Sequence, residues 1–208
     1  ETQSLFEFDV PDPVANGRDL LVDVKAVSVN PADAKRRIRT AVDTPHEAPL
    51  VLGYDAVGVV AAVGSDVTNF AVGDEVWYAG DPTRSGSNAQ RQLVDERVVG
   101  RKPKNLSWAE AAAMPLTGLT SFEMLFDRFC ITEGSGKGKS LLVIGGAGGV
   151  GSLTIQLARK LTDLTVIATA SRPETAEWCR EMGAHEIVDH RDLIAEVQGK
   201  GFDTVEYI

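Results

Sequence analysis

A glycine-rich segment in the C-terminal half constrains the fold of this chain more than any other feature. Residues 144–151 read Ile-Gly-Gly-Ala-Gly-Gly-Val-Gly and contain the spacing G-x-G-x-x-G at Gly146, Gly148 and Gly151. An apolar run precedes the segment, and a stretch with the apolar spacing of a helix follows it. Between a strand and a helix, such glycines let the backbone approach a pyrophosphate, whose charge the N–H groups at the helix start accept. The alternative is a glycine-rich turn that binds no ligand.

The order of elements after residue 140 predicts a doubly wound parallel sheet. Strands are expected at 141–144, 164–169, 186–189 and 202–208, and helices at 150–161, 173–182 and 191–198. Alternating strands and helices are typical of parallel sheets with right-handed crossovers. A dinucleotide-binding sheet normally has six strands, and four are expected here. Residues 5–8 also resemble the second strand of a hairpin whose partner is missing, so we expect a fragment of a longer protein.

The first half of the chain predicts a separate β-rich domain. Strands are expected at 20–29, 58–63, 89–94 and 97–99, with a turn at 72–77 that leads into another, and loops at 45–49 and 80–87. Ser107 and Glu110 form a capping box for a helix that ends at Pro115, and a longer helix follows at 117–129. We predict an α/β protein with a β-rich domain at residues 1–115 and a dinucleotide-binding domain at 116–208.

Composition excludes several classes of function. The 208 residues carry a net charge of −9 without a block of Lys and Arg, which argues against nucleic acid as a partner. The basic stretch 35–39 predicts a solvated loop or helix face. No apolar run approaches the length of a membrane span, and residues 1–4 do not resemble a signal peptide. Cys130 and Cys179 indicate no disulfide framework, so we expect a cytoplasmic protein with Cys130 buried.

Four motifs in combination resemble the medium-chain dehydrogenase/reductase superfamily. Residues 27–33, Val-Ser-Val-Asn-Pro-Ala-Asp, resemble a strand end of its quinone oxidoreductase branch, and residues 53–76 resemble the hallmark of its GroES-like catalytic domain. Residues 109–120 are similar to its hinge, and 145–151 to its phosphate loop. The resemblance covers nearly all of the chain. It implies a GroES-like domain followed by a Rossmann domain, with proteins labelled zinc-type alcohol dehydrogenase-like as the nearest group.

The resemblance does not extend to the zinc ligands. The zinc-dependent branch has a Cys near Asn30 and Gly-His-Glu where this chain has Gly53-Tyr54-Asp55, and the four cysteines of a structural zinc are absent between residues 75 and 110. A catalytic zinc needs about three protein ligands. The three histidines, His46, His185 and His190, are spread over both domains. We therefore predict no metal site. An alcohol dehydrogenase that recruits zinc through other ligands is the alternative.

The residues after the second expected strand of the nucleotide domain indicate the cofactor. An NAD site has an acidic residue there for the ribose 2′-OH. This chain has Ser171 and Arg172 instead, and no acid before Glu174. A hydroxyl and a guanidinium suit a 2′-phosphate, and similar pairs mark NADP preference in the family. NADPH is therefore predicted. A structural alternative is that Ser171 caps a helix with Pro173 at its first position.

The predicted cofactor-binding residues rest partly on the chemistry and order of the residues and partly on the family resemblance. Besides the glycine loop and the Ser-Arg pair, the resemblance implies that Thr117 and Thr120 line the nicotinamide riboside, and the topology places His190 and Arg191 near the adenosine. The full set is Thr117, Thr120, Gly146, Ala147, Gly148, Gly149, Val150, Gly151, Ser171, Arg172, His190 and Arg191.

The resemblance implies hydride transfer from NADPH to a small quinone or α,β-unsaturated carbonyl, without zinc. Negative charge then builds on the substrate oxygen, and preorganised donors must stabilise it. Tyr54 through its hydroxyl and Asn30 through its amide are the predicted catalytic residues. Each also has a structural explanation, because Tyr54 can pack the wall of the substrate cleft and Asn30 can shape the turn before Pro31. A non-catalytic NADPH-binding protein is the rival, and the family implies a homodimer for the full-length protein.

Overall fold

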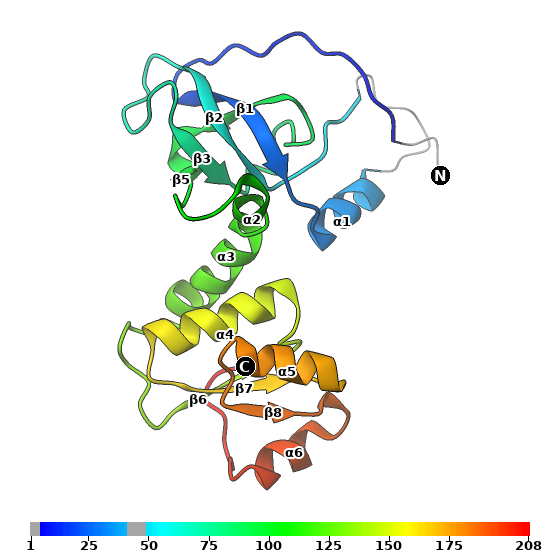
Figure 1. The fold of residues 1–208 in the computed structure, drawn as a ribbon, viewed down its shortest axis with the longest axis vertical. Helices are drawn as coiled ribbons and strands as arrows, with labels where there is room; N and C mark the ends of the chain where they lie inside the picture. Colours follow the sequence, from blue (N-terminus) through cyan, green and yellow to red (C-terminus); the bar gives the residue numbers. More distant parts are fainter. Residues whose placement is uncertain (1–4, 41–48) are drawn as a thin grey trace. The chain divides into compact units, whose positions relative to one another are not determined.

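The computed structural model describes residues 5–40 and 49–208, and the chain forms two compact units (Figure 1). The N-terminal unit comprises Glu1–Leu116 and the C-terminal unit Thr117–Ile208. The division falls one residue after the boundary expected from the sequence. Each unit has its own hydrophobic core, as expected for a chain with a β-rich first half and an α/β second half.

An antiparallel sheet of five strands in the order β4-β1-β2-β3-β5 forms the N-terminal unit. Its strands are β1 (Asp19–Val27), β2 (Ala56–Val63), β3 (Glu75–Tyr78), β4 (Arg91–Asp95) and β5 (Gly100–Arg101). The alternation predicted for β1 places Leu20 and Val22 on one face, where they pack with Val60 and Val76. The core of this unit therefore lies on that face of the sheet.

Two helices complete the N-terminal unit. Helix α1 (Pro31–Arg39) follows β1 and presents the expected basic stretch, mostly exposed. Helix α2 (Trp108–Ala112) covers the other face of the sheet, where its two buried alanines pack against Val57. The predicted capping box is confirmed, because Ser107 N donates to the Glu110 carboxylate at 2.9 Å and Glu110 N donates to Ser107 Oγ at 3.3 Å.

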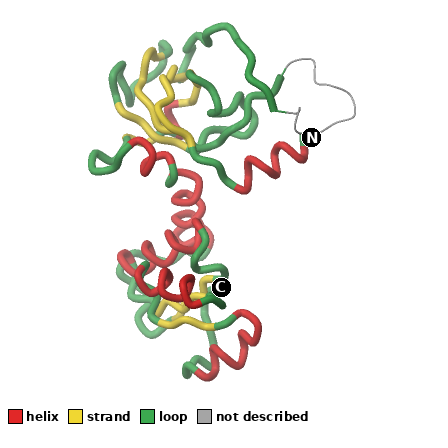
Figure 2. Tube along the Cα trace, turned by 45° about the vertical axis from the view of Figure 1, so that its right-hand side comes forward, coloured by secondary structure: helices red, strands yellow, loops and turns green. Residues whose placement is uncertain are grey.

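A parallel sheet in the order β6-β7-β8 forms the centre of the C-terminal unit. Figure 2 shows strands in yellow and helices in red. Helix α3 (Pro115–Phe122) leads into it and continues as a π-helical segment, Glu123–Arg128. The elements then alternate as predicted: β6 (Ser140–Val143), α4 (Gly149–Leu161), β7 (Thr165–Thr169), α5 (Pro173–Glu181), β8 (Glu186–Val188) and α6 (Leu193–Gly199). The doubly wound topology is confirmed.

Both faces of this sheet are covered by helices. Val143 and Val166 pack with Ile155 of α4 and with Cys179 of α5, whereas Leu142 and Ile167 face Val197 of α6. Figure 1 shows α4 and α5 on one side of the strands and α6 on the other. The strands are apolar on both faces because each lies between two helical layers, which is usual for parallel sheets.

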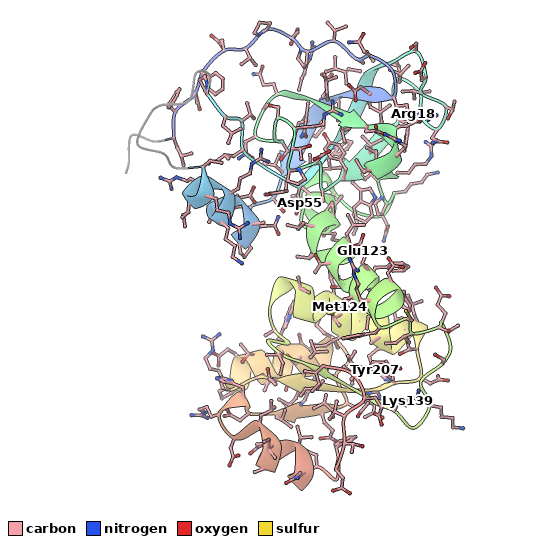
Figure 3. All side chains as sticks on the ribbon, turned by 180° about the vertical axis from the view of Figure 1, so that it is seen from behind. Arg18, Asp55, Glu123, Met124, Lys139 and Tyr207 are labelled. Carbon is pink, nitrogen blue, oxygen red and sulfur yellow. The ribbon has the colours of Figure 1, made fainter. Side chains whose placement is uncertain are left out.

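Three sequence predictions of secondary structure are wrong. Residues 97–99 do not form a strand, because Asp95 Oδ1 accepts from Arg97 N and caps a 3₁₀ turn, Glu96–Val98. Residues 5–8 are not in a strand, and the hairpin partner expected to be missing leaves that prediction untested. Residues 202–208 contribute only an isolated bridge from Tyr207 to Leu141 (Figure 3). Pro115 begins a helix, since its fixed φ suits a first helical position.

The predicted environment of Cys130 is also wrong. Cys130 is exposed and has φ of 53°, because the chain reverses there between the π-helical segment and the buried Ile131. The expected loop at 80–87 is present, whereas residues 45–48 of the other expected loop lie outside the described part of the chain.

Candidate nucleotide and substrate sites

The glycine loop joins β6 to α4 and is fixed to the end of β7. Gly145 N donates to Thr169 Oγ1 at 2.8 Å, and Gly146 N donates to the Thr169 carbonyl at 3.2 Å. Gly148 N closes a turn onto the Gly145 carbonyl at 2.9 Å. Thr169 is the last residue of β7 and is buried, so it positions the loop from the neighbouring strand. Sequence reasoning missed this role.

The path of this loop requires glycine at two positions for different reasons. Gly145 has φ of 70°, in the left-handed region that side chains disfavour. At Gly151 a Cβ atom would lie 2.4 Å from the Gly145 carbonyl oxygen and 2.8 Å from Gly146 Cα, both of them backbone atoms. The first turn of α4 therefore crosses the loop too closely for any side chain.

Helix α4 begins without a side-chain cap. Its N-cap is Gly148, and its first hydrogen bond runs from Ser152 N to the Gly148 carbonyl at 2.8 Å. Within the described part of the chain, no acceptor reaches the N–H groups of Gly149, Val150 and Gly151. Free N–H groups at the positive end of a 13-residue helix form an anion-binding site. A dinucleotide pyrophosphate therefore fits this cradle.

Ser171 and Arg172 follow β7 at the same sheet edge as the glycine loop. Both are exposed, and Arg172 Nε lies 3.2 Å from Glu174 Oε1 in a surface ion pair. Such pairs contribute little and are readily exchanged for a stronger anion. Arg172, rather than Ser171, is the N-cap of α5, so the structural explanation for Ser171 is wrong, although Pro173 does occupy the first helical position.

His190 and Arg191 follow β8, the next strand at that edge. The Arg191 guanidinium binds the Asp189 carboxylate through two nitrogens, and this pairing lowers the pKa of Asp189 to about 2. His190 Nδ1 lies 4.0 Å from Asp189 Oδ1. Parallel strands end at a common edge, so the structure brings these residues to the edge that carries the glycine loop and Ser171.

Helix α3 lies against the first turn of α4. A Cβ atom at Gly149 would be 3.2 Å from Thr117 Cγ2, which places Thr117 beside the loop. Thr120 is exposed one turn further along α3. Ser121 is fully buried, and its hydroxyl lies within hydrogen-bond distance of the Thr117 carbonyl at 2.9 Å and the Val150 carbonyl at 3.0 Å. Ser121 therefore links the two helices, a role that sequence reasoning missed.

In the N-terminal unit, Asn30 is part of a buried cluster centred on Asp55, which is labelled in Figure 3. Asn30 Nδ2 donates to Asp55 Oδ2 at 2.7 Å and to Ser28 Oγ at 3.2 Å, and Ser28 Oγ donates to Asp55 Oδ2 at 2.6 Å. Leu116 N donates to Asp55 Oδ1 at 2.8 Å, so Asp55 also caps the start of α3. Asp55 is fully buried, and desolvation raises its pKa despite these donors.

Tyr54 precedes Asp55 in the chain and is half-buried. The Cζ atom of Arg36 lies 5.8 Å from the centroid of its ring, and Arg36 Nη2 donates to the Arg84 carbonyl at 3.2 Å. Asn30 and Tyr54, the two predicted catalytic residues, are thus connected through Asp55. The contacts of Asp55 span 25 and 61 residues of sequence, so no local pattern indicated them.

The residues around Asn30 do not fit a zinc ion. Across residues 5–40 and 49–208, no group of three or more His, Cys, Asp or Glu side chains could hold a metal. The Asp55 carboxylate is occupied by hydrogen bonds instead. His185 Nδ1 accepts from Val166 N at 2.8 Å and belongs to the nucleotide unit, and His46 lies outside the described residues.

A membrane-crossing helix is absent from the part of the chain that the structure describes.

Comparison with known proteins identifies the two units. The family model of the alcohol dehydrogenase GroES-like domain matches residues 16–123, and that of the zinc-binding dehydrogenases matches residues 149–206. A solved structure of a putative zinc-dependent alcohol dehydrogenase from Rhizobium etli has 53% sequence identity and a TM-score of 0.90, over 99% of this chain and 60% of that one.

Two curated relatives cover most of the chain. A zinc-type alcohol dehydrogenase-like protein of Staphylococcus aureus is 47% identical over 100% of this chain and 62% of its own length. The chloroplastic NADPH-dependent alkenal/one oxidoreductase of Arabidopsis thaliana is 40% identical over 88% of this chain and 48% of its own length. The chain thus spans less than two thirds of these relatives. It belongs to the medium-chain dehydrogenase/reductase superfamily, with a GroES-like domain followed by a Rossmann domain.

Proposed function

We propose that this chain is the cofactor-binding and catalytic part of an NADPH-dependent reductase that acts on quinones or α,β-unsaturated carbonyl compounds without zinc. The observation that carries the proposal is the uncapped start of α4 in a glycine cradle, beside Ser171 and Arg172 at an edge where β7 ends without a carboxylate. The resemblance to quinone oxidoreductases and the similarity to an alkenal/one oxidoreductase support the substrate class.

When bound, NADPH supplies the hydride, and the protein binds and orients it. The N–H groups of residues 149–151 would receive the pyrophosphate. Ser171 would donate to the ribose 2′-phosphate, and Arg172 would exchange the Glu174 carboxylate for that phosphate. His190 and Arg191 would border the adenosine, and Thr117 and Thr120 the nicotinamide riboside.

Stabilisation of the substrate oxygen falls mainly to Tyr54. Both amide protons of Asn30 point to acceptors within the protein, Asp55 and Ser28, so Asn30 would have to release one of them to serve a substrate. The Tyr54 hydroxyl is the donor of the predicted pair that this cluster does not use. Replacing Tyr54 by Phe should therefore lower kcat about 10²- to 10³-fold, as for the loss of one oxyanion-stabilising donor.

Parallel titrations with NADPH and NADH, followed by tryptophan fluorescence, test the cofactor assignment. Trp178 reports on the site, because its Nε1 donates to Ser152 Oγ, in the first turn of α4, at 2.8 Å. We expect NADPH to bind more tightly, and the double substitution Ser171→Ala with Arg172→Gln to weaken NADPH about tenfold or more while leaving NADH unchanged. Arg180→Gln, which removes an exposed arginine from the same helix, is the matched control.

Two outcomes contradict the proposal. Equal affinity for both cofactors would refute the NADP preference, and binding of neither would refute the nucleotide site. A panel of quinones and enals then tests catalysis. Preferential NADPH binding with no turnover of any member would favour the non-catalytic NADPH-binding protein instead.

A further inference from the structure

Arg36, on α1, carries a buried donor atom that the fold leaves unused. Its Nη1 is buried and has no hydrogen-bond partner among the described residues, whereas its Nη2 donates to the Arg84 carbonyl. The guanidinium lies over the Tyr54 ring. A buried donor without an acceptor costs about 1–3 kcal/mol, and more when it is charged, so proteins rarely leave one. An acceptor from a bound molecule would therefore satisfy Arg36 Nη1.

Other polar atoms near Tyr54 share this property. Ser87 is fully buried with an unpartnered Oγ, and a Cβ atom at Gly53, the residue before Tyr54, would lie 2.4 Å from it. Asp33, one turn before Arg36 on α1, is also buried and has an unpartnered Oδ1. Three unpartnered polar atoms therefore lie on two segments next to Tyr54, helix α1 and the segment at Ser87, where a polar ligand would satisfy them.

We propose that Arg36 is a further catalytic residue, whose Nη1 donates to the substrate oxygen together with the Tyr54 hydroxyl. This inference rests on the proposed function. Addition of hydride to the β-carbon of an enone moves the carbon–carbon π pair into an enolate, so the carbonyl oxygen gains negative charge. Arg36 keeps its proton throughout, and a proton from water completes the reduction at the α-carbon.

The surroundings single out Arg36 among the donors near Tyr54. Asn30 is engaged by Asp55, and Arg84 is engaged by the Asp19 carboxylate at 2.8 and 3.0 Å. Thr83 donates two hydrogen bonds to the Asp81 carboxylate and so lowers its pKa, and the nearby charge of Arg36 adds to this without a hydrogen bond to Asp81. Arg36 is permanently charged and is held by the Tyr54 ring and the Arg84 carbonyl, so it needs little reorganisation to stabilise an oxyanion.

The test uses 4-nitrophenol, whose phenolate oxygen carries the charge that an enolate oxygen would carry. Visible absorbance reports the ionisation of the bound probe, with the complete chain in the presence and absence of NADP⁺. We expect the wild-type protein to lower the pKa of bound 4-nitrophenol by about one unit or more, which is a tenfold preference for the phenolate. Arg36→Met should abolish this shift, and Arg36→Lys, which keeps the charge, should retain part of it.

Kinetics provide the second readout. Arg36→Met should lower kcat for enones about tenfold or more while the affinity for NADPH stays unchanged. Arg39→Gln, which removes an exposed arginine from the same helix, is the control and should alter neither measurement. Thermal denaturation shows whether each variant folds, and Arg36→Lys carries the test if Arg36→Met does not fold.

The outcomes separate this inference from the proposed function. An unshifted probe in the wild-type protein, or an equal shift in wild-type and Arg36→Met, would show that Arg36 only joins α1 to the segment around Arg84 and would overturn the inference, even with NADPH preference and turnover intact. Failure of the cofactor titrations would refute the proposed function whatever the probe does.

Discussion

The path of the backbone, as well as the binding of a ligand, requires particular residues in the glycine loop. Gly151 is excluded from carrying a side chain by two backbone atoms of the loop itself, and these cannot move without shifting the β6–α4 connection. Thr169 completes the arrangement from β7 by accepting from Gly145 N. The geometry that makes room for a pyrophosphate is therefore also needed for the fold of the C-terminal unit.

Gly151→Ala should destabilise the C-terminal unit and weaken NADPH binding. Its Cβ would meet the Gly145 carbonyl oxygen at 2.4 Å, and overpacking against atoms that cannot move typically costs about 1–3 kcal/mol. Urea denaturation measures the loss, and fluorescence titration measures the affinity. Gly199→Ala is the control, because a Cβ there meets no atom within 4 Å. Equal stability of the two variants would contradict this account of the loop.

Helices α1, α2 and α3 start differently from α4, whereas α5 and α6 also lack a side-chain cap but have no glycine loop before them. Helix α2 is capped by Ser107 and Glu110, α1 begins where Asn30 N donates to Asp33 Oδ2 at 2.7 Å, and α3 is capped by Asp55. Helix α4, by contrast, begins at a glycine without a side-chain acceptor. Protein groups satisfy the first three starts, and an anion would satisfy the fourth.

The hydrogen bonds between Glu96 and the segment around Asn69 make the stability of the N-terminal unit depend on pH. The buried Glu96 carboxylate accepts from Asn69 N at 2.9 Å, Thr68 N at 3.0 Å and Arg18 at 2.7 Å, and these donors, Asn69 first, lower its pKa below the ordinary 4.5. A lowered pKa means that the unfolded chain binds the proton more readily. The Glu96 carboxylate therefore stabilises the folded protein at pH values above its ordinary pKa. This stabilisation is lost as the pH falls through its lowered pKa in the folded state.

We expect the thermal midpoint of the wild-type N-terminal unit to fall as pH decreases below 4.5, the ordinary pKa of Glu96, and through its lowered pKa. Glu96→Gln should lower the midpoint at neutral pH and flatten this dependence, because the amide does not titrate and cannot accept all three hydrogen bonds. Glu123→Gln, an exposed change of equal charge, should leave the slope as in the wild type (Figure 3). A parallel slope for Glu96→Gln and wild type would rule out this role of Glu96.

At the scale of the whole molecule, the name of a matched family implies zinc, whereas the residues of this chain at the expected ligand positions do not suit zinc. One of the two matched family models, over residues 149–206, is that of the zinc-binding dehydrogenases, yet the residues at the zinc-ligand positions expected in the other matched domain are Asn30, Tyr54 and Asp55. The structure joins two of these by a hydrogen bond at 2.7 Å, so Asp55 is satisfied without a metal. The cytoplasmic location and the homodimer stay predictions.

Metal analysis of the purified chain tests the zinc-independent proposal. We expect much less than one zinc ion per chain, and NADPH binding and reductase activity that do not change after treatment with EDTA. This follows because a catalytic zinc needs about three N, S or O ligands, and the described residues provide no such group. Stoichiometric zinc, together with loss of activity on chelation and its return with added zinc, would establish the alcohol dehydrogenase alternative.

Local sequence patterns were sufficient for the glycine loop, for most of the strands and helices of the nucleotide unit, and for one helix start in the N-terminal unit. The glycine loop, the alternation of apolar strands with helices and the capping box at Ser107 depend on neighbours within a few residues, so they are visible in the sequence. The end of β7 at Thr169, followed by Ser171 and Arg172, belongs to the same class. For these elements the chemistry of a residue and its place in the chain already indicate its surroundings.

Contacts between distant segments depended on the fold. Asp55 accepts hydrogen bonds from Ser28, Asn30 and Leu116, and Arg36 contacts Tyr54 and Arg84 across 18 and 48 residues. The sequence motif predicts Asn30 as a donor to the substrate, whereas packing directs its amide to the buried carboxylate of Asp55. Local propensity determines which residues enter a strand or helix. Burial then determines which polar groups must satisfy one another and which, like Arg36 Nη1, are left to bind another molecule.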